Sequence, residues 1–263
     1  MSIRKTVVSG SFYLNDKDEL ENLIKSFSNN INKKQNSKFE HINALITPHA
    51  GYIYSGKLAN LSFNLASKQN PKRVIVLGPS HHAYLEGSSI CLDEFYETPL
   101  GNIEVDLEYS KALMKKYDFL NSNEECAFEH STETQAPFIK YYFPTSKIIE
   151  IVYGNQDIDT LCLLLDELIQ NKDNLLVISS DLSHFHTLDD AKKLDINCID
   201  AINEKNIDKL KLCEACGKIG ITALLKTSIK NLLKTQVLEY STSYETNNDK
   251  QRVVGYTTAI IGK

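Results

Sequence analysis

Short runs rich in β-branched residues alternate with helical stretches along this chain of 263 residues, and this alternation constrains the fold more than any other feature. The runs INALIT and RVIVLG are continuously apolar, which is typical of central strands that are buried on both faces. The sequence therefore predicts one α/β domain over residues 1–263, with a central, mostly parallel sheet flanked by helices. Expected strands are 42–47, 73–78, 147–154 and 174–180, and expected helices are 17–28, 57–67, 107–117 and 158–170.

The remaining segments predict further elements around this repeating core. Residues 88–106 resemble a hairpin with its turn at 99–102, and the Asn/Lys-rich residues 29–40 are typical of a solvated loop. A helical region is expected over 188–233, interrupted near Cys216 and Gly217. Two strand-like runs, 236–244 and 252–262, close the chain.

Composition excludes several classes of function. The net charge is −5, and only Arg4, Arg73 and Arg252 are arginines, so the guanidinium contacts that nucleic-acid readers favour are scarce. There is no run of 18 apolar residues, and the N-terminal residues lack the apolar core of a signal peptide. We therefore expect no nucleic-acid partner, no membrane association and a cytoplasmic location.

The six cysteines are expected to be reduced thiols, because they are sparse and no export signal accompanies them. Cys213 and Cys216 form a C-x-x-C, but no second pair or nearby histidine completes a zinc-finger pattern. We interpret them as two thiols around a helix start at Gly217. The cysteines are residues 91, 126, 162, 198, 213 and 216.

Three histidines follow predicted strands at positions that suit a shared site. His49, His81 and His184 each lie two to five residues beyond a strand end, in the loop before a helix. Ligands of open parallel sheets bind at the carboxyl ends of the strands. Imidazoles with an oxygen donor such as Asp181 predict a mononuclear Fe, Zn or Cu site. His41, His82 and His186 are expected to be structural or solvated.

Nucleotide-binding and hydrolase motifs match only in part. Residues 51–57 have the spacing of a phosphate-binding loop, but Leu58 stands where Mg²⁺ needs a hydroxyl. No G-x-G-x-x-G follows a strand, so no nucleotide cofactor is expected. In GPSHH, His82 occupies the second glycine position of a nucleophile elbow, which argues against a serine hydrolase.

A set of longer motifs resembles one known family over essentially the whole chain. They are SGSFY, TPHAGYIYSG, VLGPSHH, EHSTETQAPFI, SSDLSHF, CGKIGITALL and VVGYTTA. Their order and approximate spacing resemble the Memo family, whose bacterial and archaeal members are often named AmmeMemoRadiSam system protein B.

This resemblance implies a domain similar to class III extradiol dioxygenases, in which two histidines and a carboxylate hold Fe(II) and a further histidine acts as acid/base. His49 and His81 match the family's metal-binding histidines. The resemblance further implies His184 as the acid/base group, with Asp181 beside it and His130 as another residue of the catalytic pocket. Tyr54 would form an aromatic wall.

The third metal ligand is left open by the resemblance. Some Memo proteins place a cysteine before the last strand, and counting back from Tyr256 puts Thr246 at that position. The adjacent Glu245 could restore the dioxygenase carboxylate. In an extended strand neighbouring side chains point to opposite faces, so only one of Glu245 and Thr246 could face the metal without a bulge.

Two functions follow as hypotheses. The first is metal-dependent redox or oxygen chemistry on an unknown small substrate, with Fe(II) expected first and Cu or Zn as the other divalent metals. The second is a non-catalytic scaffold that binds a peptide or small ligand in the same pocket. The family name further suggests a radical SAM enzyme and an AMMECR-type protein as partners.

Overall fold

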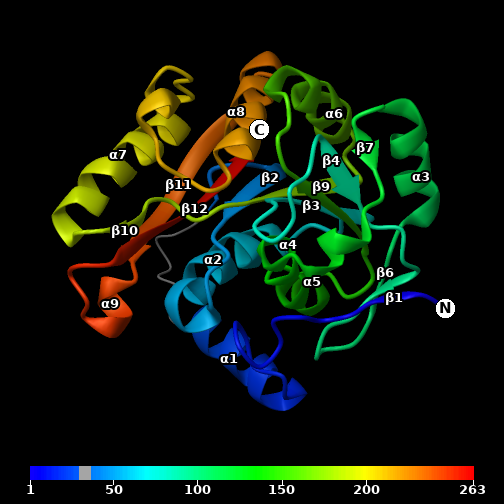
Figure 1. Cartoon of the computed structure of the whole chain (residues 1–263), viewed down its shortest axis with the longest axis horizontal. Coiled ribbons are helices and arrows are strands. Elements are labelled where there is room, and N and C mark those ends of the chain that lie inside the picture. The colour runs from blue at the N-terminus through cyan, green and yellow to red at the C-terminus, as the bar shows by residue number, and fades with distance from the viewer. Residues whose placement is uncertain (30–36) are drawn as a thin grey trace.

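The computed structural model describes residues 1–29 and 37–263, so most of the loop expected at 29–40 lies outside the described residues. A large mixed sheet forms the centre of the α/β domain, with strand order β10-β12-β2-β9-β3-β8-β4-β7 and β11 beside β12 (Figure 1). Its strands are β2 (Ile42–Thr47), β3 (Arg73–Pro79), β4 (Ser88–Ile90), β7 (Leu120–Asn121), β8 (Lys147–Tyr153), β9 (Asn174–Ser179), β10 (His184–His186), β11 (Lys234–Thr242) and β12 (Val253–Gly262).

The parallel part of the sheet is its centre, where β2, β9, β3 and β8 lie side by side. Antiparallel strands continue the sheet on both sides, because β12 pairs antiparallel with β2, β10 and β11, and β4 pairs antiparallel with β8. The sequence thus predicted the parallel βαβ centre, and the antiparallel flanks make the whole sheet mixed.

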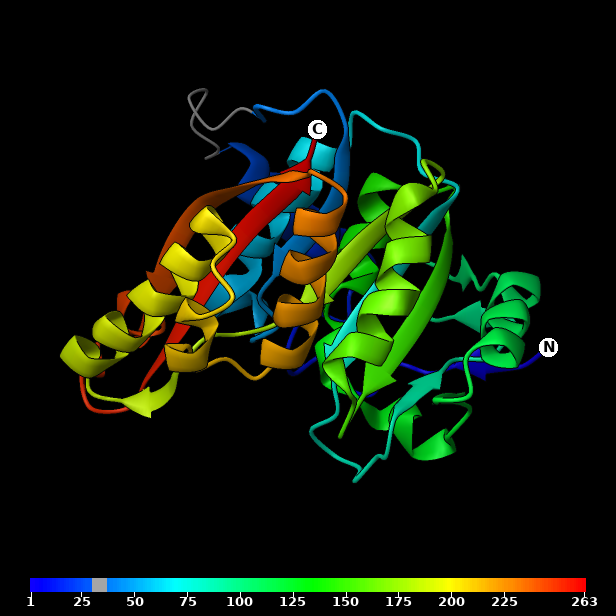
Figure 2. The same ribbon diagram turned by 90° about the horizontal axis from the view of Figure 1, so that it is seen from above.

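Helices cover both faces of the sheet (Figure 2). On one side are α1 (Lys17–Asn29), α2 (Lys57–Ala66) and α5 (Ala136–Tyr142), and on the other are α6 (Ile158–Gln170), α7 (Leu188–Glu204) and α8 (Lys218–Lys230). Successive residues of a strand point to opposite faces. Accordingly Ile75 and Leu77 of β3 pack in the core under α6 and α8, whereas Val74 and Val76 pack in the core under α2.

The expected hairpin at 88–106 is divided between two sheets. Strand β4 joins the large sheet, while β5 (Phe95–Tyr96) and β6 (Ile103–Glu104) pair with each other in a small sheet that includes β1 (Ile3–Arg4). Helix α3 (Leu107–Lys116) follows, and Asp106 caps it by accepting a hydrogen bond from the Tyr109 backbone N–H.

Several short elements connect these layers. A π-helical turn, η1 (Tyr52–Gly56), leads into α2, and 3-10 turns occupy η2 (Glu124–Phe128) and η3 (Lys209–Leu212). The single-turn helices are α4 (His130–Glu133) and α9 (Tyr244–Asn247). Within the described ranges, the structure contains no helix whose length and apolar content would let it cross a bilayer.

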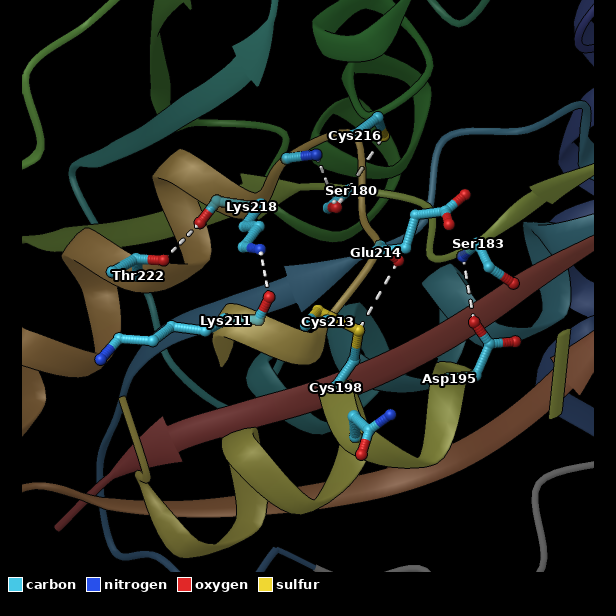
Figure 3. Close-up of a disulfide and its surroundings, with 12 residues drawn as sticks. Ser180, Ser183, Asp195, Cys198, Lys211, Cys213, Glu214, Cys216, Lys218 and Thr222 are labelled. Atoms are coloured by element: carbon cyan, nitrogen blue, oxygen red, sulfur yellow. Dashed lines mark hydrogen bonds between the residues drawn. A yellow bond between two sulfur atoms is a disulfide. The ribbon is translucent and has the colours of Figure 1, made fainter. Parts of the chain in front are cut away.

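The expectation that all six cysteines are reduced is wrong. Cys198 of α7 and Cys213, just after η3, form a disulfide with a Cα–Cα distance of 4.8 Å (Figure 3). Their 15-residue sequence separation gave no sign of this pairing. The chain turns back after α7, and the packing of η3 against α7 brings the two buried side chains together. The helix start expected after Cys216 is confirmed, because α8 begins at Lys218 with Gly217 before it.

Candidate metal centre

Three histidines converge at the carboxyl ends of the central strands. His49 follows β2, His81 follows β3, and His130 is the first residue of α4. Strands β2 and β3 both flank β9 and run parallel to it, so their carboxyl ends lie at the same edge of the sheet. One ring nitrogen from each of the three histidines lies within 4.8 Å of the other two.

Hydrogen bonds fix the tautomer of His49. Its Nδ1 lies 2.9 Å from Ser179 Oγ, and the Ser179 hydroxyl donates its single proton to the carbonyl of Ser131 at 2.6 Å. Gln135 Nε2 donates to the same Oγ at 3.0 Å. Because the hydroxyl proton is already used, Ser179 Oγ accepts from His49 Nδ1–H. The lone pair of His49 is therefore on Nε2, the nitrogen available to a metal.

Glu129 orients the other two imidazoles. Its Oε1 accepts from His81 Nδ1 at 2.9 Å and from the Ser131 backbone N–H at 2.9 Å, and its Oε2 accepts from the His81 backbone N–H at 2.6 Å. His130 Nδ1 lies 3.3 Å from Glu129 Oε1. The hydrogen bond from His81 Nδ1 to the carboxylate keeps the proton there and leaves Nε2 of His81 free, whereas His130 Nδ1 also has His82 Nε2 as a hydrogen-bond partner at 3.2 Å.

The protonation states of the side chains in this site favour the binding of a cation. Burial first, and then the neighbouring imidazoles of His81 and His130, hold the pKa of His49 well below its usual value. Burial likewise lowers the pKa of His130 to about 4. Although burial alone would raise it, hydrogen bonds from the His81 ring and backbone lower the pKa of Glu129 to about 2. At neutral pH, His49 and His130 are therefore neutral and Glu129 is ionised.

Cys216 brings a thiol to the same place. Its Sγ lies 3.3 Å from His49 Nε2, and the Asp181 backbone N–H donates to that sulfur at 3.3 Å. Burial, followed by the charge of Asp181, raises the pKa of Cys216 to about 12. The thiol is therefore protonated when no cation is near, and a metal that binds it would displace the proton.

The donor set fits a single divalent ion. Two nitrogens bound to one tetrahedral zinc lie about 3.3 Å apart, and a bound nitrogen and sulfur about 3.5 Å apart. The three imidazole nitrogens, within 4.8 Å of one another, approach the first spacing. The Cys216 sulfur lies 3.3 Å from His49 Nε2, but among the described residues no group of three ligand atoms within 4.8 Å of one another includes it. The hydrogen-bonded Nδ1 atoms supply the outer partners that metal-binding histidines usually have.

A second group of possible ligands, His82, Glu129 and His130, overlaps the first. His82 Nε2 lies 3.2 Å from His130 Nδ1, and His82 is exposed. The Glu129 oxygens already accept the hydrogen bonds that hold His81, so a metal there would compete with these bonds. We therefore take the group around buried His49 as the candidate centre.

Asp181 and His184 lie beside the centre in different roles. Asp181 is buried, and its Oδ1 accepts from the His49 backbone N–H at 2.8 Å, so it holds the loop that carries His49. Burial raises the pKa of Asp181 to about 7. His184 of β10 is half-buried, and burial, together with His81, lowers its pKa.

The candidates for the third ligand do not join the imidazoles. The segment expected to be an extended strand is the helical turn α9, where Glu245 Oε2 accepts from the Thr242 backbone N–H at 2.7 Å and from its hydroxyl at 2.6 Å. Thr246 is exposed and donates to the carbonyl of Ile53 at 3.3 Å. The thiol beside His49 belongs to Cys216, about 30 positions earlier in the chain. Tyr54 is half-buried in η1, which follows the His49 loop.

A buried ion pair supports the segment that carries Glu129 and His130. Arg4, 1% exposed, donates to the Glu129 carbonyl at 2.8 Å and pairs with the fully buried carboxylate of Glu133. The backbone N–H groups of Val7 and Val8 also donate to Glu133, at 2.9–3.0 Å. The N-terminal segment thus holds α4 against the sheet.

Sequence reasoning missed Glu129, Ser179 and Cys216 as parts of this centre. Glu129 adjoins His130, and both it and Cys216 lie inside motifs that carried the family resemblance. Such motif positions were the available signal for these two residues. Ser179 also lies in one of these motifs, as the first residue of SSDLSHF, but it ends a buried strand, where its hydroxyl resembles an ordinary core residue.

Comparisons with known proteins agree with these motifs. A family model described as Memo-like protein matches residues 4–260. A MEMO1 family protein of Nitrosopumilus maritimus is 33% identical over 271 residues, covering 97% of this chain and 98% of its own. A MEMO1 family protein of Methanosarcina mazei is 33% identical over 276 residues, covering 99% of this chain and 100% of its own. One of Thermoplasma volcanium is 31% identical over 267 residues, covering 98% of each chain.

Proposed function

The chain belongs to the Memo family, and on that premise we propose that it is a metal-dependent oxidoreductase acting on a small substrate. In this proposal one divalent ion is held by the Nε2 atoms of His49, His81 and His130. The observation that carries it is the convergence of three imidazoles whose Nδ1 atoms already have partners. The fold resemblance to dioxygenases supports a redox reaction only by analogy.

The donor set favours copper or zinc over Fe(II). The facial triad of Fe(II) oxygenases contains a carboxylate. The carboxylate of Glu245, the candidate for that position, instead accepts hydrogen bonds from Thr242. Imidazoles together with the Cys216 thiolate suit copper and zinc, and copper alone of the two supports redox chemistry. When bound, the ion would supply a Lewis acid and, if it is copper, one-electron transfer.

The chain's own residues position the donors and move protons. Glu129 keeps the proton on His81 Nδ1, and Ser179 does the same for His49 Nδ1. His184 is half-buried with a lowered pKa, so its neutral ring can accept a proton from a substrate hydroxyl near neutral pH. Asp181 holds the His49 loop through its backbone N–H.

Metal titration tests the proposal directly. Metal-free wild type, His49→Ala, His81→Ala and a control, His41→Ala, are titrated with Cu²⁺, Zn²⁺ and Fe²⁺ under anaerobic conditions. We expect one ion per chain for wild type and His41→Ala, and a loss of at least about a hundredfold in affinity for the other two, since each ligand contributes several kcal/mol. Undiminished binding by His49→Ala would overturn the assignment of the ligands.

Turnover tests the redox half of the proposal. O₂ consumption with catechols and other phenols is followed for the copper-loaded and iron-loaded protein and for His184→Gln. Turnover that falls in His184→Gln supports the proposal, and metal binding without turnover of any phenol contradicts it.

A non-catalytic scaffold is the second candidate, and the Cys216 thiol is the observation that favours it. The Cys216 sulfur lies 3.3 Å from His49 Nε2, and if its thiolate joined the three imidazoles it would complete a tetrahedral set, as in structural zinc sites, and leave no position for a substrate. A Cys216→Ser variant that gains turnover on opening the site would favour the enzyme. A radical SAM enzyme and an AMMECR-type protein are proposed as partners on the family resemblance alone.

A further inference from the structure

Cys216 belongs to a short loop, residues 213–217, that connects η3 to α8 and is tied to α7 by the disulfide (Figure 3). Cys213 starts the loop, and its sulfur is bonded to Cys198, in the third turn of α7. Both cysteines are buried, at 4% and 0% exposure. The covalent tie therefore lies three residues from the thiol that faces His49.

The rest of the loop packs directly on the segment after β9. The Gly217 backbone N–H donates to Ser180 Oγ at 2.9 Å. A Cβ on Gly217 would meet Ser180 Cβ at 2.5 Å and the Ser179 carbonyl at 2.7 Å, so this contact admits glycine alone without a shift. A small displacement of the loop thus changes the position of Cys216 relative to His49.

Besides the Cys216 sulfur, which accepts from the Asp181 backbone N–H at 3.3 Å, the loop has one more side-chain contact, and this one is exposed. Glu214 accepts from His186 Nε2 at 2.9 Å, and both side chains are more than a third exposed. Ion pairs of this kind contribute little. The disulfide is by contrast a buried cross-link that removes alternative loop conformations. It is the stronger of these two restraints on the loop.

We propose that the Cys198–Cys213 disulfide is a redox-controlled tie that positions Cys216 at His49 and so regulates the metal centre. A dithiol reductant breaks the S–S bond, Cys198 and Cys213 each gain one hydrogen, and the dithiol becomes a disulfide. Two thiols that are not bonded to each other need a longer sulfur–sulfur distance than a disulfide. Because both side chains are buried, the loop moves to provide this distance. Cys216 then leaves His49, and the centre holds its ion less tightly.

The predicted effect on metal affinity rests on the proposed metal centre, whereas the predicted positioning of Cys216 does not. Cys216 is half-buried at His49, so its accessibility reports the loop position with no metal present. The metal-free protein is treated with iodoacetamide under native conditions, and the modification of Cys216 is followed by mass spectrometry. The samples are oxidised wild type, dithiothreitol-reduced wild type after removal of the reductant, Cys198→Ala/Cys213→Ala, and a control, Cys162→Ala.

We expect Cys216 to react about tenfold faster in the reduced protein and in the double variant, because the loop opens more easily without the cross-link. Cys162→Ala, which removes a free half-buried thiol of α6, should behave as oxidised wild type. The reduced wild type provides the test if the double variant does not fold. Equal Cys216 reactivity in oxidised and reduced protein would overturn the proposal, and so would a Cys213–Cys216 disulfide in the treated samples.

Zn²⁺ titration of the same samples separates this inference from the proposed function. If oxidised wild type binds Zn²⁺ and loses about tenfold in affinity on reduction, both stand. If affinity is unchanged by reduction, the regulatory tie is wrong and the metal centre stands. If no sample binds metal while Cys216 reactivity still follows the disulfide, the proposed function and the regulation of metal binding fail, and only the positioning of Cys216 remains.

Discussion

Replacing Glu129 with glutamine is expected to weaken metal binding while the chain still folds. In the wild type the carboxylate accepts hydrogen bonds from His81 Nδ1, the His81 backbone N–H and the Ser131 backbone N–H. All three partners are donors. Glutamine offers one acceptor oxygen and one NH₂ group, so it cannot satisfy all three in either orientation.

Each orientation of the glutamine damages the centre in a definite way. If the NH₂ group faces the His81 backbone N–H, two donors oppose each other and the loop is pushed away. If the NH₂ group faces the His81 ring, it favours the tautomer with its proton on Nε2, which is the nitrogen that must bind the metal. The Ser131 backbone N–H then loses its acceptor as well.

The size of the effect follows from the role of such outer partners. Removing one typically costs about 10- to 100-fold in metal affinity, or about 1.4–2.8 kcal/mol. We place Glu129→Gln at the upper end of this range because Glu129 also lies 3.3 Å from His130 Nδ1. The lost charge-assisted hydrogen bonds should lower the free energy of unfolding of the metal-free protein by about 1.5–3 kcal/mol.

Zn²⁺ titration of metal-free protein in competition with a chromophoric chelator measures the affinity, and circular dichroism checks the fold. The matched control is Glu167→Gln, because Glu167 accepts from Lys116 and Tyr117 at the surface, far from the imidazoles in the fold. Wild-type affinity in Glu129→Gln, or an equal loss in Glu167→Gln, would refute the reasoning.

Three further predictions concern the fold around the centre. Gly255→Ala should lower the free energy of unfolding by about 1–3 kcal/mol in urea titrations, because the new Cβ would lie 1.9 Å from Asp195 Oδ2. Burial raises the pKa of Asp195 in the folded protein, so folding favours the neutral carboxyl group. This contribution to stability is fully present below the pKa of Asp195 in the unfolded chain, about 3.9, and is lost as pH rises through the pKa of the folded state. The difference in unfolding free energy between wild type and Asp195→Asn should therefore decline as pH is raised above about 4, and a constant difference would contradict this. Arg4→Met should cost about 3–5 kcal/mol of stability by leaving the Glu133 carboxylate unpaired, and Glu133→Gln in the same chain should recover part of it.

Much of the fold follows from local sequence patterns. The apolar runs of β2, β3, β8 and β9 predict buried parallel strands, because a strand covered on both faces has no polar side. The position of His49 and His81 just after two such strands places both at one edge of the sheet. These inferences need only the periodicity of a strand and the direction of parallel neighbours.

The tertiary structure decided which side chains complete the centre. Counting along the chain pointed to Thr246, whereas the thiol beside His49 comes from Cys216, in a loop that packs on the segment after β9. The disulfide and the Glu129 hydrogen bonds likewise join residues from separate segments. Sequence periodicity reports which face of an element is buried, but contacts between loops depend on how the layers pack, and no local pattern records that packing.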